Sequence, residues 1–141
     1  MTIKIIPADQ WFSKCTRLRT NYVCEFCNGK HDQSSSGLHA SHLFGRRSYA
    51  TRFHPDNIFS HCYGCHSYLG SNPIIFTAWA TVRLGEGMIE LLRERNRDVS
   101  AAKIIKKDLK SVAKHYKNEY IRMLDLRICG DDGRIEFVNY L

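Results

Sequence analysis

The hydrophobic and polar positions along the chain divide it into three stretches. In residues 74–141 the apolar residues recur at the spacing of α-helices, whereas residues 24–73 show no long apolar period. The middle stretch is instead rich in Cys, His, Gly and Ser, so we predict short strands and loops held together by a metal. Residues 1–23 form a short lead-in with aromatic and basic side chains. The pattern predicts an α+β fold, with a small metal-stabilised core followed by a mainly helical C-terminal part.

Three helices and a short final strand are predicted in the C-terminal part. The segment PIIFTAWATVRLG begins with Pro73 in a first-turn position and ends at Gly85, which suits a helix C-terminus. GMIELLRERNRD is a second short helix, and Ser100 is the expected N-cap of a long helix over about residues 101–126. The tail RIEFVNYL alternates between apolar and polar residues, which is typical of a strand.

The charge balance favours a polyanionic partner. The chain has 21 Lys and Arg against 14 Asp and Glu, a formal net charge of +7. Each phosphate that such residues neutralise releases a counterion, so nucleic acid is the expected partner, although plain solubility explains the same excess. Five lysines follow one face of the long helix and predict phosphate contacts, with a solvated face as the alternative: Lys103, Lys107, Lys110, Lys114 and Lys117.

Four of the six cysteines form two identical Cys-x-x-Cys pairs, Cys24 with Cys27 and Cys62 with Cys65. The chain shows neither a signal-peptide core nor a membrane span, so we expect a cytoplasmic protein, in which disulfides are rare. Four thiolates complete a tetrahedral Zn²⁺ site with no open position, and such a site stabilises a fold without catalysing. The other two cysteines, Cys15 and Cys129, are expected to be free thiols.

A second group of residues surrounds this predicted zinc site. The segment LHASHLF predicts a strand that carries His42, and Asn57 follows fifteen residues later in a turn. His66 follows nine residues after Asn57, immediately after Cys65, so one helix would carry both a zinc ligand and a histidine. A strand, a turn and a helix of this kind form a ββα element that the zinc would hold at both ends.

These stretches resemble the HNH (His-Me finger) nucleases. CEFC, LHASHLFGRR, RFHPDNI and HCYGCHSYLGSNP carry the resemblance over about residues 22–73, and NIFSHCYGCH matches the Asn-x4-Cys-x2-Cys-His pattern of the zinc-knuckle subclass. Within the family the chain is most similar to the phage NinG/Rap recombination proteins. The resemblance implies a treble-clef-like ββα-metal core and a structure-specific endonuclease for branched DNA such as Holliday junctions. The location would be the host cytoplasm if the chain is phage-encoded.

The resemblance also implies a role for each site residue. His42 would be the general base, Asn57 would orient it through a backbone contact, and His66 would bind a catalytic Mg²⁺ or Mn²⁺. Many HNH nucleases place an aspartate ligand immediately before the base, but this chain has Ser41 there, and its neutral hydroxyl would be a weak ligand of the catalytic ion. The ion would then rely on His66, water and DNA phosphates alone, or another side chain would replace the aspartate, or the site would be inactive. Because strand alternation puts His39 on the same face as Ser41, we hypothesise that His39 helps to bind the ion.

Three arginines between His42 and Asn57 are further candidates for DNA contacts. Arginine forks match phosphate oxygens, so we predict backbone contacts there, with solubilising loop charge as the alternative: Arg46, Arg47 and Arg52. A four-way junction has approximate two-fold symmetry, so a homodimer is expected. Its interface would use apolar residues after residue 73, which also suit an ordinary core: Ile75, Phe76, Trp79 and the helical series from Ile105 to Tyr116.

Three other functions stay open at this point. A sequence-specific or nicking HNH endonuclease would use the same residues, because phosphate contacts carry no sequence information. The second is a catalytically silent zinc-finger module that binds nucleic acid, which is favoured because Ser41 stands where an aspartate would bind the catalytic ion. A zinc-stabilised protein-interaction module explains neither the charge nor the presence of His42, Asn57 and His66 together.

Overall fold

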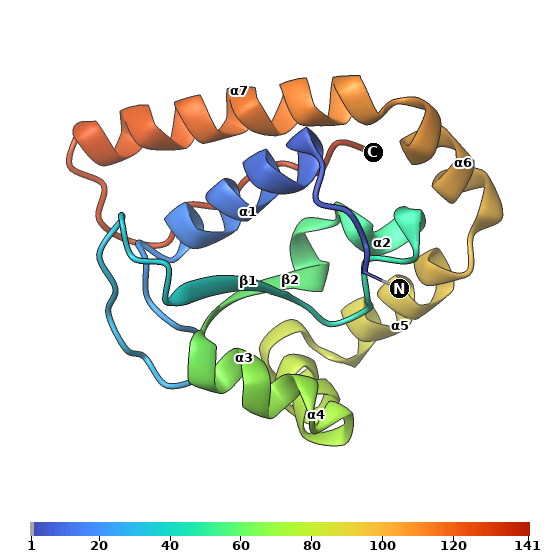
Figure 1. The fold of residues 1–141 in the computed structure, drawn as a ribbon, viewed down its shortest axis with the longest axis horizontal. Helices are drawn as coiled ribbons and strands as arrows, with labels where there is room; N and C mark the ends of the chain where they lie inside the picture. Colours follow the sequence, from blue (N-terminus) through green and yellow to red (C-terminus); the bar gives the residue numbers. More distant parts are fainter. Residues whose placement is uncertain (1) are drawn as a thin grey trace.

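The computed structural model describes residues 2–141 as a mixed α+β fold with a two-stranded antiparallel sheet at its centre (Figure 1). The helices and strands, in chain order, are α1 (Pro7–Arg19), β1 (Leu38–His42), α2 (Tyr49–Arg52), the 3-10 turn η1 (Pro55–Asn57), β2 (Ile58–Cys62), α3 (Tyr63–Gly70), α4 (Pro73–Leu84), α5 (Glu86–Asn96), α6 (Val99–Lys107) and α7 (Leu109–Ile128). Within the described residues, no helix combines the length and the apolar character needed to cross a membrane.

The two faces of the sheet bury different hydrophobic clusters. β1 and β2 pair so that His39 lies opposite His61 and His42 lies opposite Ile58. Because successive side chains of a strand point to opposite faces, Ile58 and Phe59 enter different clusters. Ile58 packs with residues of α1 and α7, and Phe59 packs with residues of α3 and α4. The sheet therefore separates an α1–α7 layer from an α3–α4 layer, as Figure 1 shows.

The N-terminal stretch contributes a helix to the larger cluster. In α1, which lies alongside α7 in Figure 1, Phe12 is only 1% exposed. Its ring centroid lies 4.8 Å from that of Tyr116 in α7, 5.8 Å from that of Phe53 and 5.7 Å from that of Phe137. These edge-to-face contacts join the start, the middle and the end of the chain.

The predicted long helix is instead two helices, α6 and α7, so that prediction was wrong. The chain bends at Asp108, whose backbone N–H bonds to Ile104 O and Ile105 O at 3.0 and 3.1 Å, and whose carboxylate accepts from the Tyr140 hydroxyl at 3.0 Å. The N-cap is Asp98 rather than Ser100, because the Asp98 carboxylate accepts the Ala101 N–H at 3.0 Å. The two shorter predicted helices are confirmed as α4 and α5.

The predicted terminal strand is absent from the described residues, although its alternation is real. The side chains of Ile135 and Phe137 are each 4% exposed, whereas that of the next residue, Val138, is 61% exposed. The backbone of this segment bonds to the end of α1 and to side chains of α7 rather than to a partner strand. The Ile135 N–H donates to Arg19 O at 3.1 Å, and the Val138 N–H donates to Glu119 Oε1 at 2.6 Å. A segment can therefore alternate between buried and exposed side chains without pairing with another strand in a β-sheet.

Most of the residues offered as a dimer interface belong to the core of this chain. Phe76 lies in the cluster on the α3–α4 side of the sheet, and Ile105 and Tyr116 lie in the cluster on the α1–α7 side. Trp79 is half-buried against the cluster that contains Phe76, and the side chain of Ile75 is 40% exposed. Phe76, Ile105 and Tyr116 are therefore ordinary core residues, which was the alternative that the sequence left open, and the homodimer stays a prediction.

Candidate metal centre and active site

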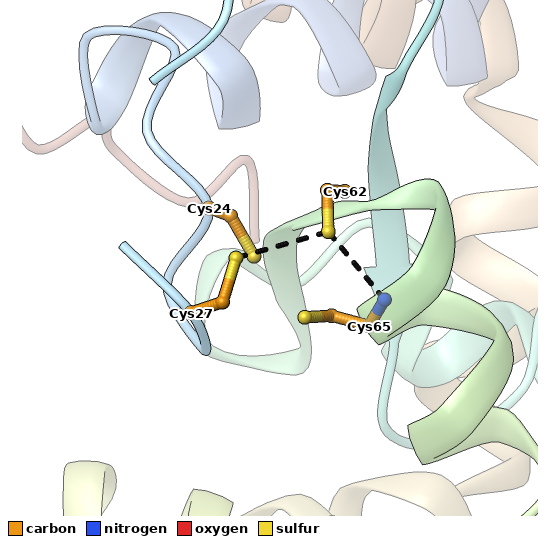
Figure 2. Close-up of side chains that lie close together, drawn as sticks. All are labelled: Cys24, Cys27, Cys62 and Cys65. Atoms are coloured by element: carbon orange, nitrogen blue, oxygen red, sulfur yellow. Dashed lines mark hydrogen bonds between the residues drawn. The ribbon is translucent and has the colours of Figure 1, made fainter. Parts of the chain in front are cut away.

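The four paired cysteines meet at one point (Figure 2). Cys24 and Cys27 come from the loop between α1 and β1, and Cys62 and Cys65 come from the junction of β2 and α3. All four Sγ atoms lie within 4.8 Å of one another, and those of Cys27 and Cys62 are 3.8 Å apart. Tetrahedral Zn–S bonds of about 2.3 Å place sulfur atoms about 3.8 Å apart. The arrangement is compatible with a structural zinc.

Protein contacts also hold the first cysteine pair against the sheet. Glu25, between Cys24 and Cys27, exchanges two 2.8 Å hydrogen bonds with Ser60 of β2: its backbone N–H donates to Ser60 O, and its carboxylate accepts the Ser60 N–H. The same buried carboxylate pairs with Arg83 at 2.6 Å and Arg134 at 3.0 Å. The knuckle is thus tied to β2, to α4 and to the C-terminal segment.

The other two cysteines play no part in this centre. Cys15 is fully buried, and its thiol donates to the Tyr116 carbonyl at 3.2 Å. Burial raises the pKa of the Cys15 thiol to about 12, so it stays protonated and unreactive. Cys129 is exposed at the end of α7. Both are the free thiols that the sequence predicts.

A cleft of about 940 Å³ opens between α1 and β1. His42 and His66 both line it, and both also line a smaller hollow of about 160 Å³ beside Ser41. The structure therefore brings these two histidines to one place, although they come from β1 and α3. Lys14, Arg17, His39 and Arg46 also line the larger cleft.

The tautomer of His42 follows from the hydrogen bond that its ring makes. His42 Nε2 lies 2.9 Å from the carbonyl oxygen of Arg52, which can only accept, so Nε2 carries the proton and Nδ1 keeps a lone pair. Burial, together with the positive charge of Arg46, lowers the pKa of His42 to about 4. The imidazole is therefore neutral near pH 7, the form that accepts a proton.

Asn57 lies behind the cleft rather than in it, and its side chain is fully buried. Its amide nitrogen donates to the carbonyls of Thr51 and Phe44, each at 2.9 Å, and its amide oxygen accepts the Phe44 N–H at 2.7 Å. These bonds fix the backbone next to Arg52, whose carbonyl holds His42. Asn57 thus reaches His42 through the backbone and makes no contact with the cleft itself.

His39 and His66 face each other across the cleft floor. Their Nδ1 atoms are 3.0 Å apart, and His39 Nε2 lies 3.1 Å from the Ser36 carbonyl, which leaves the lone pair on His39 Nδ1. Two ligands at right angles, with bonds of about 2.1 Å, would lie about 3.0 Å apart. The same distance suits a hydrogen bond from His66 Nδ1–H to His39 Nδ1, so the pair is compatible with two adjacent ligands of one ion but does not require an ion. Ser41 is only 1% exposed, and in residues 2–141 the four-cysteine group is the only cluster of three or more His, Cys, Asp or Glu ligands.

The three predicted arginines lie in different environments. Arg46 lines the cleft and Arg47 is exposed, so both can reach a phosphate. Arg52 is 2% exposed, and its Nε and Nη2 atoms bond to the two carboxylate oxygens of Asp9 in α1 at 3.0 and 2.6 Å. The prediction that Arg52 contacts DNA is wrong, because its guanidinium is already paired in the interior.

We expect the Arg52→Ala variant to lose about 3–5 kcal/mol of unfolding free energy, because it leaves the Asp9 carboxylate buried without its partner. Urea unfolding followed by circular dichroism measures this loss. Arg46→Ala, at a more accessible arginine in the loop before α2, is the control and should change stability by less than about 0.5 kcal/mol. A loss below 1 kcal/mol for Arg52→Ala would contradict a structural role for the ion pair.

The five predicted lysines are all exposed, but the bend at Asp108 divides them. Lys103 and Lys107 belong to α6, whereas the remaining three belong to α7. They therefore do not form the single stripe that one long helix would give. Their contact with DNA stays a prediction.

The sequence interpretation missed the wall of the cleft that α1 provides. The signal was present, since buried residues recur at helical spacing in this stretch (Ala8, Phe12, Cys15 and Leu18). His61, outside the candidate catalytic set, was expected to be structural, and it is fully buried and stacks on Phe59 with ring centroids 5.9 Å apart. Comparison with protein-family models, with curated proteins and with solved structures found no match for this chain.

Proposed function

We propose that this protein is a metal-dependent, structure-specific DNA endonuclease with a zinc-stabilised ββα-metal core of the HNH type. The observation that carries the proposal is the meeting of a neutral His42 with the His39–His66 pair in one cleft. Zinc binding by cysteines requires none of these three histidines. The preference for branched DNA such as Holliday junctions, and a role in phage recombination, rest on the resemblance to the NinG/Rap proteins.

The chain would divide the reaction among few residues. His42 takes a proton from the attacking water at Nδ1, while its Nε2–H stays bonded to the Arg52 carbonyl and fixes the ring. His39 and His66 would hold a catalytic Mg²⁺ or Mn²⁺, and such an ion would supply positive charge to the scissile phosphate and to the departing 3′ oxygen. Arg46 contacts a neighbouring phosphate oxygen. The expected products carry 5′-phosphate and 3′-hydroxyl ends.

The proposal is tested by incubating the protein with matched linear duplex, flap and four-way junction DNA, in the presence of Mg²⁺, Mn²⁺ or EDTA. We expect cleavage that requires an added divalent ion and is fastest on the junction. Two paired incisions would agree with the expected homodimer. Binding that is independent of metal, with no cleavage of any substrate, would exclude the enzyme.

The ligand set makes a second prediction, about metal binding. Two imidazoles and no carboxylate favour Mn²⁺ over Mg²⁺, which prefers oxygen ligands. In the zinc-loaded protein, His39→Ala should weaken Mn²⁺ binding about tenfold or more, which is about 1.4 kcal/mol or more. The electron paramagnetic resonance signal of free Mn²⁺ measures this affinity. His31→Ala, at a histidine that does not line the cleft, is the control, and equal affinities for the two variants would remove His39 from the site.

One observation favours a second candidate, a catalytically silent zinc module that binds nucleic acid. Ser41 stands buried where many HNH nucleases have a carboxylate, and no third His, Cys, Asp or Glu in residues 2–141 joins His39 and His66. The cleavage assay separates the two candidates directly. Efficient cutting of linear duplex would instead favour the sequence-specific or nicking endonuclease.

A further inference from the structure

One wall of the cleft is a polar face of α1 that the catalytic proposal does not use. The buried residues of α1 point into the core, and the opposite face presents Gln10, Ser13, Lys14 and Arg17 to the cleft. These four residues follow the i, i+3, i+4, i+7 spacing of one helix face. The same cleft is lined on its other side by His39 and His42.

This face is positively charged and its cations are unpaired. Within residues 2–141, Lys14, Arg17 and Lys117 form no salt bridge. Asp9 also lines the cleft, but its carboxylate is bound to Arg52. The charge of Asp9 is therefore already neutralised, and the α1 wall has a net positive charge.

The positive charge continues from α1 onto α7 across an aromatic side chain. Lys14 Nζ lies 4.6 Å from the ring centroid of Trp11, and Lys117 Nζ lies 5.8 Å from the same centroid. The face of an indole attracts cations, but two ammonium groups beside one ring also repel each other. A bound anion between them would relieve that repulsion. Positive charge along a cleft also concentrates anionic ligands there.

We propose that the α1 wall binds the phosphate backbone of the nucleic acid strand that leads away from the scissile bond. Lys14 and Arg17 contact successive phosphates, and Lys117 extends the track onto α7. At 1.5 Å per residue, the wall from Gln10 to Arg17 is about 10 Å long, which is long enough to contact successive phosphates of one strand. Such contacts position the strand without reading its sequence.

This inference rests on the proposed function and adds the path of the substrate strand. The path runs from His42 along α1, and not over α6, whose lysines do not line the cleft. In Figure 1, α6 lies at the right of the molecule, past the N-terminal end of α1, whereas β1 starts at the left. The two lysines of α6 that the sequence offered for DNA binding, Lys103 and Lys107, therefore provide a matched control.

The test compares the double variants Lys14→Ala/Arg17→Ala and Lys103→Ala/Lys107→Ala, which lose the same charge. Fluorescence anisotropy of a labelled four-way junction, without added divalent ions, gives the affinity between 50 and 200 mM salt. For the α1 variant we expect about a tenfold loss of affinity and a salt slope lower by about 2, one unit for each lost phosphate contact. For the α6 variant we expect less than about a threefold loss.

The outcomes separate this inference from the proposed nuclease function. Equal losses for the two double variants, with the wild type still cutting DNA, would overturn the α1 track and leave the nuclease standing. A selective loss for the α1 variant in a protein that binds but never cuts would support the track and exclude the nuclease. A wild type that neither binds nor cuts overturns both. Lys14→Glu, at an exposed side chain, gives the same comparison if the α1 double variant does not fold.

Discussion

Replacing His42 by alanine is expected to slow DNA cleavage by about 100- to 10,000-fold, the usual contribution of a general base. The reason is geometric as well as chemical. His42 is held by the Arg52 carbonyl at 2.9 Å, so its other ring nitrogen is the one that can take a proton from water. The single-turnover rate at saturating protein, with Mn²⁺ and junction DNA, measures the chemical step without product release.

Two further variants separate the base from the scaffold. His42→Gln keeps an amide that can donate to the Arg52 carbonyl but has no basic nitrogen, so it should be as slow as His42→Ala. His115→Ala removes a histidine of α7 that bonds to the Val138 carbonyl at 2.7 Å and does not line the cleft. It should cut at the wild-type rate. A His42→Gln variant within threefold of wild type would show that this histidine only positions the loop.

Local signals in the sequence were enough to predict several elements. The two Cys-x-x-Cys pairs predicted a four-cysteine cluster, and the structure places the four sulfur atoms together. Pro73 and Gly85 marked the ends of α4, since proline suits a first turn and Gly85 has a φ of +87°. These features depend on a few neighbouring residues, which is why the sequence alone could reveal them.

The errors came from contacts between distant residues. Arg46 lies in the loop before α2 and Arg52 ends α2, but only Arg52 meets Asp9, 43 positions away in the chain. Likewise, the lysines keep their helical spacing across Asp108, where Tyr140 from the end of the chain helps to hold a bend. Spacing within a segment carries no information about such partners.

The positions of His39 and His66, the candidate metal ligands, were only partly predictable from the sequence. Strand alternation was enough to place His39 on the face of Ser41. The 3.0 Å approach of His39 to His66, however, depends on how α3 leaves β2. That direction is fixed where Cys62 caps α3 and accepts the Cys65 N–H at 3.5 Å, directly before His66. The cysteine cluster and the catalytic proposal are therefore coupled through one helix turn.

This coupling predicts the effect of removing the zinc. The variant Cys62→Ala, or prolonged chelation, should lower the free energy of unfolding by at least about 5 kcal/mol. Structural zinc contributes about 10–16 kcal/mol in small zinc domains, and we expect a smaller loss here because protein contacts also hold the cysteines. For a chain of this size the melting temperature should fall by about 15 °C or more. Thermal denaturation by circular dichroism, with the zinc content from native mass spectrometry, measures both quantities. Cys129→Ala, at an exposed thiol outside the cluster, is the control and should keep one zinc and the wild-type melting temperature.

The loss should also be uneven across the molecule. Phe59, Leu69 and Phe76 depend on α3 and should lose protection from hydrogen exchange first. Phe12 and Tyr116 pack between α1 and α7, in a cluster that contains none of the four paired cysteines, and should keep it longer. Cleavage should disappear together with the protection of α3, because His66 follows Cys65 directly. If the zinc leaves completely and the melting temperature does not change, the bonds of Glu25 to Ser60, Arg83 and Arg134 hold the knuckle by themselves. The metal would then serve only the second cysteine pair and the position of His66.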